Sequence, residues 1–304
     1  MKRILLSAAA LLSAVALSAQ TGAGEYLSRY ALLVGKVGPA GVGVETLVNK
    51  WEADYPDDVD MLCAKYNYYF VKSQRNEVVS KAQARFLGAD PILTLKDSAG
   101  VDVNYFTETF YDDEMYGIAS QAIDKAIRLR PEDISLRFSK ITSLLAYEKE
   151  SPDMATQALR SLIDYHASFH PSWTYGGEAF SDEDFVNSMS EYCYALHRTG
   201  SPAALESFRS VSEKLLSYYP KNALFLNDIG SYYLLKKEYK TAQKYFTKTL
   251  KLDPDNYAAV KNLVVLFRKT GNAKQEKKYL QQLIRISPDE REQSSAKVRL
   301  EAMK

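Results

Sequence analysis

The sequence is poor in residues that bind metals. Its 304 residues include three histidines and two cysteines, Cys63 and Cys193, and two cysteines cannot build a cysteine-rich zinc site. His166 and His170 lie four residues apart, a spacing that can bring two imidazoles to one zinc ion. Pro171 follows at once and predicts that the helix ends there, and no H-E-x-x-H pattern is present. We therefore expect no metal and no other cofactor.

Motifs of catalytic sites are also missing. The sequence contains no serine nucleophile elbow, no phosphate-binding glycine loop and no dinucleotide fingerprint. The isolated Gly176-Gly177 pair is typical of a turn. These absences predict a protein that is not an enzyme.

Neither sign of charge is in excess. Lys and Arg number 39 against 38 Asp and Glu, a net charge of +1. A nucleic-acid binder usually carries a basic surplus, and a protein held on an anionic membrane surface usually carries a basic run. The near-neutral composition therefore predicts a partner other than nucleic acid, and no attachment to an anionic membrane surface.

Long apolar runs are absent except at the start of the chain. Lys2 and Arg3 precede an apolar stretch at residues 4–17, and small residues follow. This pattern predicts a cleavable signal peptide at residues 1–19 and export to the periplasm or outside the cell. An uncleaved anchor is the alternative, although the stretch is short for a membrane span, and we expect no other spanning segment.

Three prolines mark an internal repeat. Pro220, Pro254 and Pro288 are evenly spaced, and each separates two amphipathic stretches. A proline stops one helix, and the Asp or Asn that follows can cap the next helix. Their spacing of about 34 residues is the period of tandem helix–turn–helix units, which the sequence therefore predicts.

Between the prolines the sequence resembles the tetratricopeptide repeat (TPR). The first unit matches at Leu226, Ile229, Gly230, Tyr233, Ala242, Phe246 and Pro254. The second unit keeps Val260, Leu263, Val264, Phe267, Leu280 and Pro288. Gly230 and Ala242 are small enough for two helices to approach closely. The second unit has Glu276 where the family has Ala, which predicts weaker packing there.

The resemblance implies an all-α fold, a right-handed α-solenoid of TPR-like helix hairpins. The residues at about 91–106 add a small β-hairpin insertion to it. The predicted parts are a signal peptide at 1–19, degenerate repeats at 20–220, two TPR repeats at 221–288 and a capping helix at 289–304. Because each repeat of a solenoid contacts mainly its neighbours, we expect Cys63 and Cys193 to be buried and unpaired. Aromatic clusters on helices, such as Tyr66, Tyr68 and Phe70, are expected in the core.

Two segments interrupt the helical pattern. Residues 91–96 and 101–106 read as strands joined by a turn. This hairpin either packs on its own repeats or offers an edge to an extended peptide. Residues 168–182 form an aromatic loop with Trp173 and Tyr175. The loop either fills a gap between repeats or presents its rings to a protein or a sugar.

The resemblance also implies a partner in a concave groove lined by the first helix of each repeat. The candidate groove residues are Leu224, Asn227, Ser231, Leu234, Lys261, Asn262, Val265 and Arg268. Asn262 fits one place of the carboxylate clamp that some family members use, but Asn227 and Ser231 stand where the clamp has Lys and Asn. We expect a non-enzymatic protein-interaction scaffold of the cell envelope. The alternative is a glycan-binding module that uses Trp173 and Tyr175.

Overall fold

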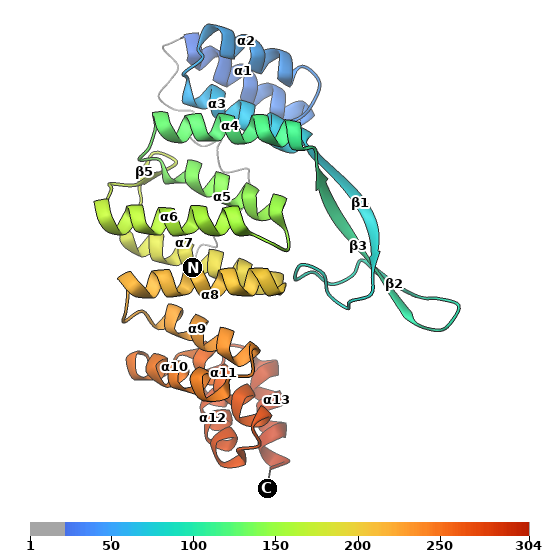
Figure 1. Cartoon of the computed structure of the whole chain (residues 1–304), viewed down its shortest axis with the longest axis vertical. Helices are drawn as coiled ribbons and strands as arrows, with labels where there is room; N and C mark the ends of the chain where they lie inside the picture. The colour runs from blue at the N-terminus through green and yellow to red at the C-terminus, as the bar shows by residue number, and fades with distance from the viewer. Residues whose placement is uncertain (1–21, 304) are drawn as a thin grey trace. The chain divides into compact units, whose positions relative to one another are not determined.

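The computed structural model describes residues 22–303, so the predicted signal peptide lies outside the described residues. The described residues divide into two compact units between Ser188 and Met189, within helix α7 (Asp182–Thr199). Figure 1 shows the elements in chain order by colour. None of the helices described between residues 22 and 303 combines the length and apolar character of a membrane-crossing segment.

The first unit combines helix hairpins with two small sheets. Its helices are α1 (Gly22–Val37), α2 (Val44–Asp54), α3 (Val59–Lys72), α4 (Asp113–Leu129), α5 (Ile134–Glu148), α6 (Asp153–Phe169) and the start of α7. Its strands are β1 (Gln74–Lys81), β2 (Leu93–Lys96), β3 (Asp102–Tyr111), β4 (Thr174–Tyr175) and β5 (Glu178–Ala179). Consecutive helices pack together within the pairs α1–α2, α3–α4 and α5–α6.

The described residues of the second unit form helices joined by short turns, with no strand among them. After the end of α7 it contains α8 (Pro202–Tyr218), α9 (Ala223–Leu235), α10 (Tyr239–Leu252), α11 (Tyr257–Lys269), α12 (Ala273–Ile286) and α13 (Glu290–Glu301). Helix α9 packs on α10, and α11 packs on α12. These are the two hairpins predicted from the proline spacing, and α13 is the predicted end helix.

The caps after the prolines are confirmed. Asn222 accepts hydrogen bonds from the backbone N–H groups at the start of α9, Asn256 from that of Ala259, and Asp289 from that of Arg291. Each cap satisfies donors that the first helical turn leaves unpaired, worth about 1 kcal/mol per cap.

Close packing of α9 on α10 is also confirmed. Gly230 lies so near Phe246 that a Cβ at position 230 would stand 2.5 Å from a ring carbon. Ala242 and Phe246 are fully buried. In addition, Tyr233 stacks on Tyr245 with 5.8 Å between the ring centroids. A larger side chain at 230 would push the two helices apart.

The expectation of weaker packing at Glu276 is wrong. Its side chain is only 3% exposed, and its carboxylate accepts hydrogen bonds from Arg268 of α11 at 2.9 Å and from Arg299 of α13 at 2.9 and 3.1 Å. The two guanidinium groups replace the water that the carboxylate loses, so the buried charge is paired. Glu276 therefore links three helices instead of loosening one pair.

Aromatic side chains dominate the core around α3 in the first unit. Tyr66, Tyr68 and Phe70 are buried, as predicted. Tyr66 stacks on Phe70, and its hydroxyl donates to the backbone oxygen of Ser139 at 3.0 Å. Burial without that bond would leave a polar hydroxyl unsatisfied. Tyrosine thus fills the core and also links α3 to α5.

The insertion in the first unit contains the predicted hairpin, formed by β2 and β3, and adds a third antiparallel strand, β1, that the sequence did not predict. Strand β3 lies in the middle and pairs with β1 on one side and β2 on the other. The sheet is inserted between α3 and α4 (Figure 1). At its base the Asp112 N–H donates to the Ser73 carbonyl at 2.8 Å. One face is covered where Phe86, from the β1–β2 connection, packs on Phe106.

The two cysteines are as predicted, since Cys63 and Cys193 are both buried and free. Burial raises the pKa of the Cys63 thiol to about 12. A thiol so far from ionisation is a poor nucleophile.

Candidate functional site

The predicted groove residues of the second unit converge on one polar cluster. The amide nitrogen of Asn262, on α11, donates to Asn227 Oδ1 at 3.2 Å and to Ser231 Oγ at 3.0 Å, both on α9. All three side chains are half-buried. We call the surface around this cluster the α9–α11 face, formed by Leu224, Asn227, Ser231, Lys261, Asn262, Val265 and Arg268.

The cluster keeps unused hydrogen-bonding capacity. The Asn227 side-chain nitrogen and the Asn262 side-chain oxygen have no partner within residues 22–303. An amide can donate two hydrogen bonds and accept two. One free donor and one free acceptor on adjacent helices match the C=O and N–H groups of a peptide backbone.

The apolar candidates divide between surface and core. Leu224 is 41% exposed. Val265 is half-buried and packs against the core between α10 and α11. The assignment of Leu234 to the groove is wrong, because it is 9% exposed and belongs to the core with Phe246 and Leu263.

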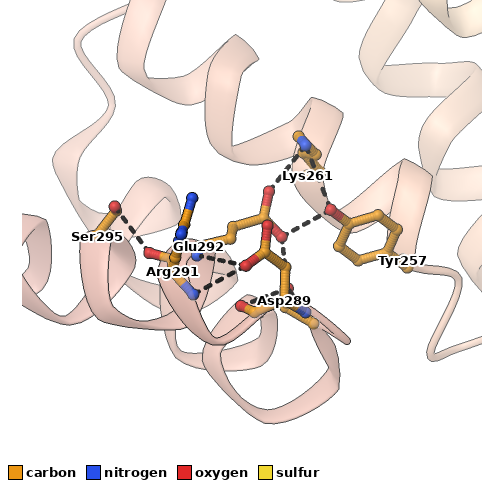
Figure 2. Close-up of polar contacts among 7 residues, drawn as sticks. Tyr257, Lys261, Asp289, Arg291, Glu292 and Ser295 are labelled. Atoms are coloured by element: carbon orange, nitrogen blue, oxygen red, sulfur yellow. Dashed lines mark hydrogen bonds and ion pairs between the residues drawn. The ribbon is translucent and has the colours of Figure 1, made fainter.

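Lys261 is engaged within the protein. Figure 2 shows its ammonium group beside the Glu292 carboxylate of α13, at 2.8 Å. The hydroxyls of Tyr257 and Ser287 also donate to Glu292, at 2.7 and 2.6 Å. Burial disfavours the charged form of Glu292, but these bonds outweigh it and hold the pKa of the carboxyl below its usual value. Lys261 thus fastens α13 to α11, and its charge is already neutralised.

Arg268 is engaged as well, in the triad with Glu276 and Arg299. Its side chain is half exposed, whereas Glu276 is buried. The bonds from Arg299 and Arg268 keep the pKa of Glu276 low, so the carboxylate is ionised at neutral pH. Two guanidinium groups on one carboxylate leave one positive charge in excess at this end of the α9–α11 face.

Glu292 was not identified from the sequence, yet a spacing signal points to it. The Asn227–Asn262 and Tyr257–Glu292 hydrogen bonds both join residues 35 positions apart. Successive first helices of a repeat therefore place residue i beside residue i+35. The Asn227–Asn262 pair alone sets this spacing, and the same spacing counted from Tyr257 leads to Glu292.

The aromatic loop of the first unit packs inward. Trp173 is 3% exposed, and its indole N–H donates to His166 Nδ1 at 3.0 Å. With Nδ1 accepting, Nε2 of the neutral ring carries the proton and donates to Asp182 at 2.8 Å. Tyr175 packs on Phe138. The role of Trp173 as an exposed sugar platform is therefore wrong, since the loop fills space between its own helices.

The described residues 22–303 hold no group of three His, Cys, Asp or Glu side chains arranged for a metal ion. His170, the second predicted imidazole, is the C-cap of α6 with a left-handed backbone. Helix α6 ends at Phe169, as Pro171 indicated, so His166 lies in its last turn and His170 lies just beyond it.

A family model matches the end of the second unit, and some solved structures resemble the chain. Residues 221–298 match the family described as the TT21 fifth ARM repeats domain. The structure of Pseudomonas aeruginosa pilF is similar at 16% identity and a TM-score of 0.37, covering 61% of this chain and 82% of that one. The flexible tandem repeat domain of a bacterial cellulose synthase is similar at 16% identity and a TM-score of 0.26, covering 96% of this chain and 95% of that one. No curated protein matches the chain in sequence.

The family match and the hairpin contacts within the second unit define the class. Residues 221–298 are therefore helical repeats of the TPR-like type. Proteins of this architecture present extended surfaces built from successive repeats, and these surfaces commonly bind other proteins.

Proposed function

We propose that the α9–α11 face binds an extended segment of a partner protein, and that the protein is a non-enzymatic interaction scaffold of the cell envelope. The proposal depends on the Asn227–Ser231–Asn262 cluster. Its internal bonds fix two amides in place, and each amide keeps hydrogen-bonding capacity for a ligand. Fixed groups lose little conformational freedom on binding, which favours affinity.

The chemistry of the face favours backbone recognition over capture of an acidic side chain. Lys261 is paired with Glu292, and Arg268 shares Glu276 with Arg299. A ligand carboxylate would have to compete with these carboxylates. The amides of Asn227 and Asn262 face no such competition, and Leu224 supplies an exposed apolar contact beside them.

The binding experiment uses peptides selected from a random library against the full chain. An Asn227→Ala/Asn262→Ala variant should bind them roughly 5- to 150-fold more weakly, because two neutral hydrogen bonds contribute about 0.5–1.5 kcal/mol each. Thr247→Ala, on the exposed face of α10, is the matched control and should bind as the wild type does. Circular dichroism would verify that both variants fold. Equal affinity of the double variant and the control would refute the placement of the site.

Export is the second part of the proposal, and the pattern of residues 1–19 supports it. Cell fractionation with N-terminal sequencing of the recovered protein tests it. A mature protein in the envelope that begins near residue 20 is the expected result. A cytoplasmic chain that retains Met1 would contradict export but not peptide binding.

A further inference from the structure

The near-neutral total charge hides a strongly basic segment. Residues 239–286, which run from α10 to α12, contain eleven Lys and Arg but three Asp and Glu, a net charge of +8. The whole chain carries +1. The charges are therefore separated along the sequence, and the balance of the whole chain does not describe this part of its surface.

The lysines of this segment occupy repeated positions. On α10 they are spaced four, four and three residues apart, which places them along one side of the helix. Two of them, Lys240 and Lys244, recur at the matching positions of α12, the second helix of the next repeat. We call these exposed residues the basic face, formed by Lys240, Lys244, Lys248, Lys251, Lys274, Lys277 and Lys278.

No carboxylate balances the basic face within the described residues 22–303. None of its lysines forms an ion pair there, and two rest over tyrosine rings, Lys248 over Tyr245 and Lys278 over Tyr279. The three carboxylates of residues 239–286 have other partners. Glu276 is held by two arginines, Asp255 is paired with Arg285, and Asp253 accepts a hydrogen bond from Asn256. Like charges four residues apart on a helix repel one another. An external anion would remove this repulsion.

We propose that the basic face docks on an anionic lipid bilayer. Its four lysines on α10 border a shallow hollow that is open to solvent, and not an enclosed pocket for a single bound group. A discrete exposed ion pair adds from nothing to about fivefold in affinity. A lysine near an anionic membrane surface adds about fivefold without being fixed in one rotamer. Several mobile lysines therefore gain more from a continuous anionic surface than from an acidic peptide. This inference concerns α10 and α12 and does not depend on peptide binding at the α9–α11 face.

The test is co-sedimentation of the full chain with vesicles of two compositions, phosphatidylcholine alone and phosphatidylcholine containing phosphatidylglycerol. The wild type should bind the anionic vesicles and release them at about 1 M salt, where the Debye length falls to about 3 Å. Replacing Lys240, Lys244, Lys248 and Lys251 by Gln should weaken this binding at least tenfold. The matched control replaces four exposed lysines elsewhere by Gln, namely Lys50, Lys72, Lys221 and Lys297.

The outcomes are distinguishable. A control variant that binds as the wild type does, together with a loss of tenfold or more in the α10 variant, supports the inference. Equal binding to both vesicle compositions, a loss below tenfold, or the same loss in the control would overturn it. Tighter binding to a soluble poly-glutamate peptide than to anionic vesicles would assign the face to an acidic protein segment and would also overturn it. Peptide binding at the α9–α11 face should be unchanged in the α10 variant.

Discussion

Replacing Asp228 by Asn should remove most of the pH dependence of folding between pH 5 and pH 8. Asp228 lies on α9, and its Oδ2 atom is buried without a hydrogen-bond partner among the described residues. Burial raises the pKa of Asp228 from 3.8 to about 7. Burial, and then the nearby Asp228 carboxylate, also raises the pKa of the Cys193 thiol, so this part of the second unit disfavours negative charge.

The size of the effect follows from the two pKa values of Asp228. The unfolded chain releases the proton near pH 3.8, whereas the folded chain holds it up to about pH 7. The stabilising contribution is therefore complete below about pH 4 and is lost as the pH rises to about 7. At about 1.4 kcal/mol per pH unit, the loss is roughly 4 kcal/mol in all, of which roughly 3 kcal/mol falls between pH 5 and pH 8.

The assay is urea unfolding of the full chain at several pH values. The free energy of unfolding of the wild type, compared with that of Asp228→Asn, should fall by roughly 3 kcal/mol from pH 5 to pH 8. All other side chains are the same in the two proteins, so their effects cancel in the difference. Glu238→Gln, which removes a charge at an exposed position, should follow the wild type. Parallel curves for Asp228→Asn and the wild type would refute the reasoning.

Two further predictions concern packing and charge in the second unit. Gly230→Ala should lower the free energy of unfolding by about 1–2 kcal/mol in urea, because the strain of a Cβ placed 2.5 Å from the Phe246 ring exceeds the gain in helix propensity. Gly117→Ala, on α4 with open space around it, should instead stabilise by about 0.5–1 kcal/mol, and equal effects would contradict the close-approach argument. Glu276→Gln should lower the free energy of unfolding by about 1–3 kcal/mol at pH 7. The hydrogen bond from Arg299 lowers the pKa of Glu276, so the wild type loses stability below about pH 4.5 as this carboxylate is protonated, and the variant should lack that loss. A Glu276→Gln protein as stable as the wild type at pH 7 would show that the triad adds nothing.

The helices and caps of the second unit were predictable because their causes are local. A proline and a capping Asn or Asp lie within a few residues of the starts of α9, α11 and α13, and the repeat brings them back at the same point of each unit. The close approach of α9 and α10 at Gly230 was predictable as well, because the TPR pattern places a small residue where two helices come close together. The central residues of the α9–α11 face, Asn227, Ser231 and Asn262, follow from the same register.

Features that depend on distant residues were not predictable. Strand β1 exposes most of its side chains and has no apolar alternation, so only its pairing with β3 defines it as a strand. Glu276 looked like a packing fault because its arginine partners lie 8 residues before it and 23 residues after it. Leu234 and Leu235 are adjacent at the end of α9, and the packing of α10 and α11 decides that the first is buried and the second exposed.

The hydrogen bond between Ser73 and Asp112 closes the base of the β-sheet, and this explains why the repeat period is not visible in this part of the first unit. Residues 59–73 and 112–129, joined end to end, are nearly as long as one repeat of the second unit. Helices α3 and α4 thus pack as a helix hairpin, and the β-sheet stands where a short turn would join them. A sequence comparison of the α3–α4 hairpin with the later repeats should therefore leave out residues 74–111 and join residues 59–73 directly to residues 112–129.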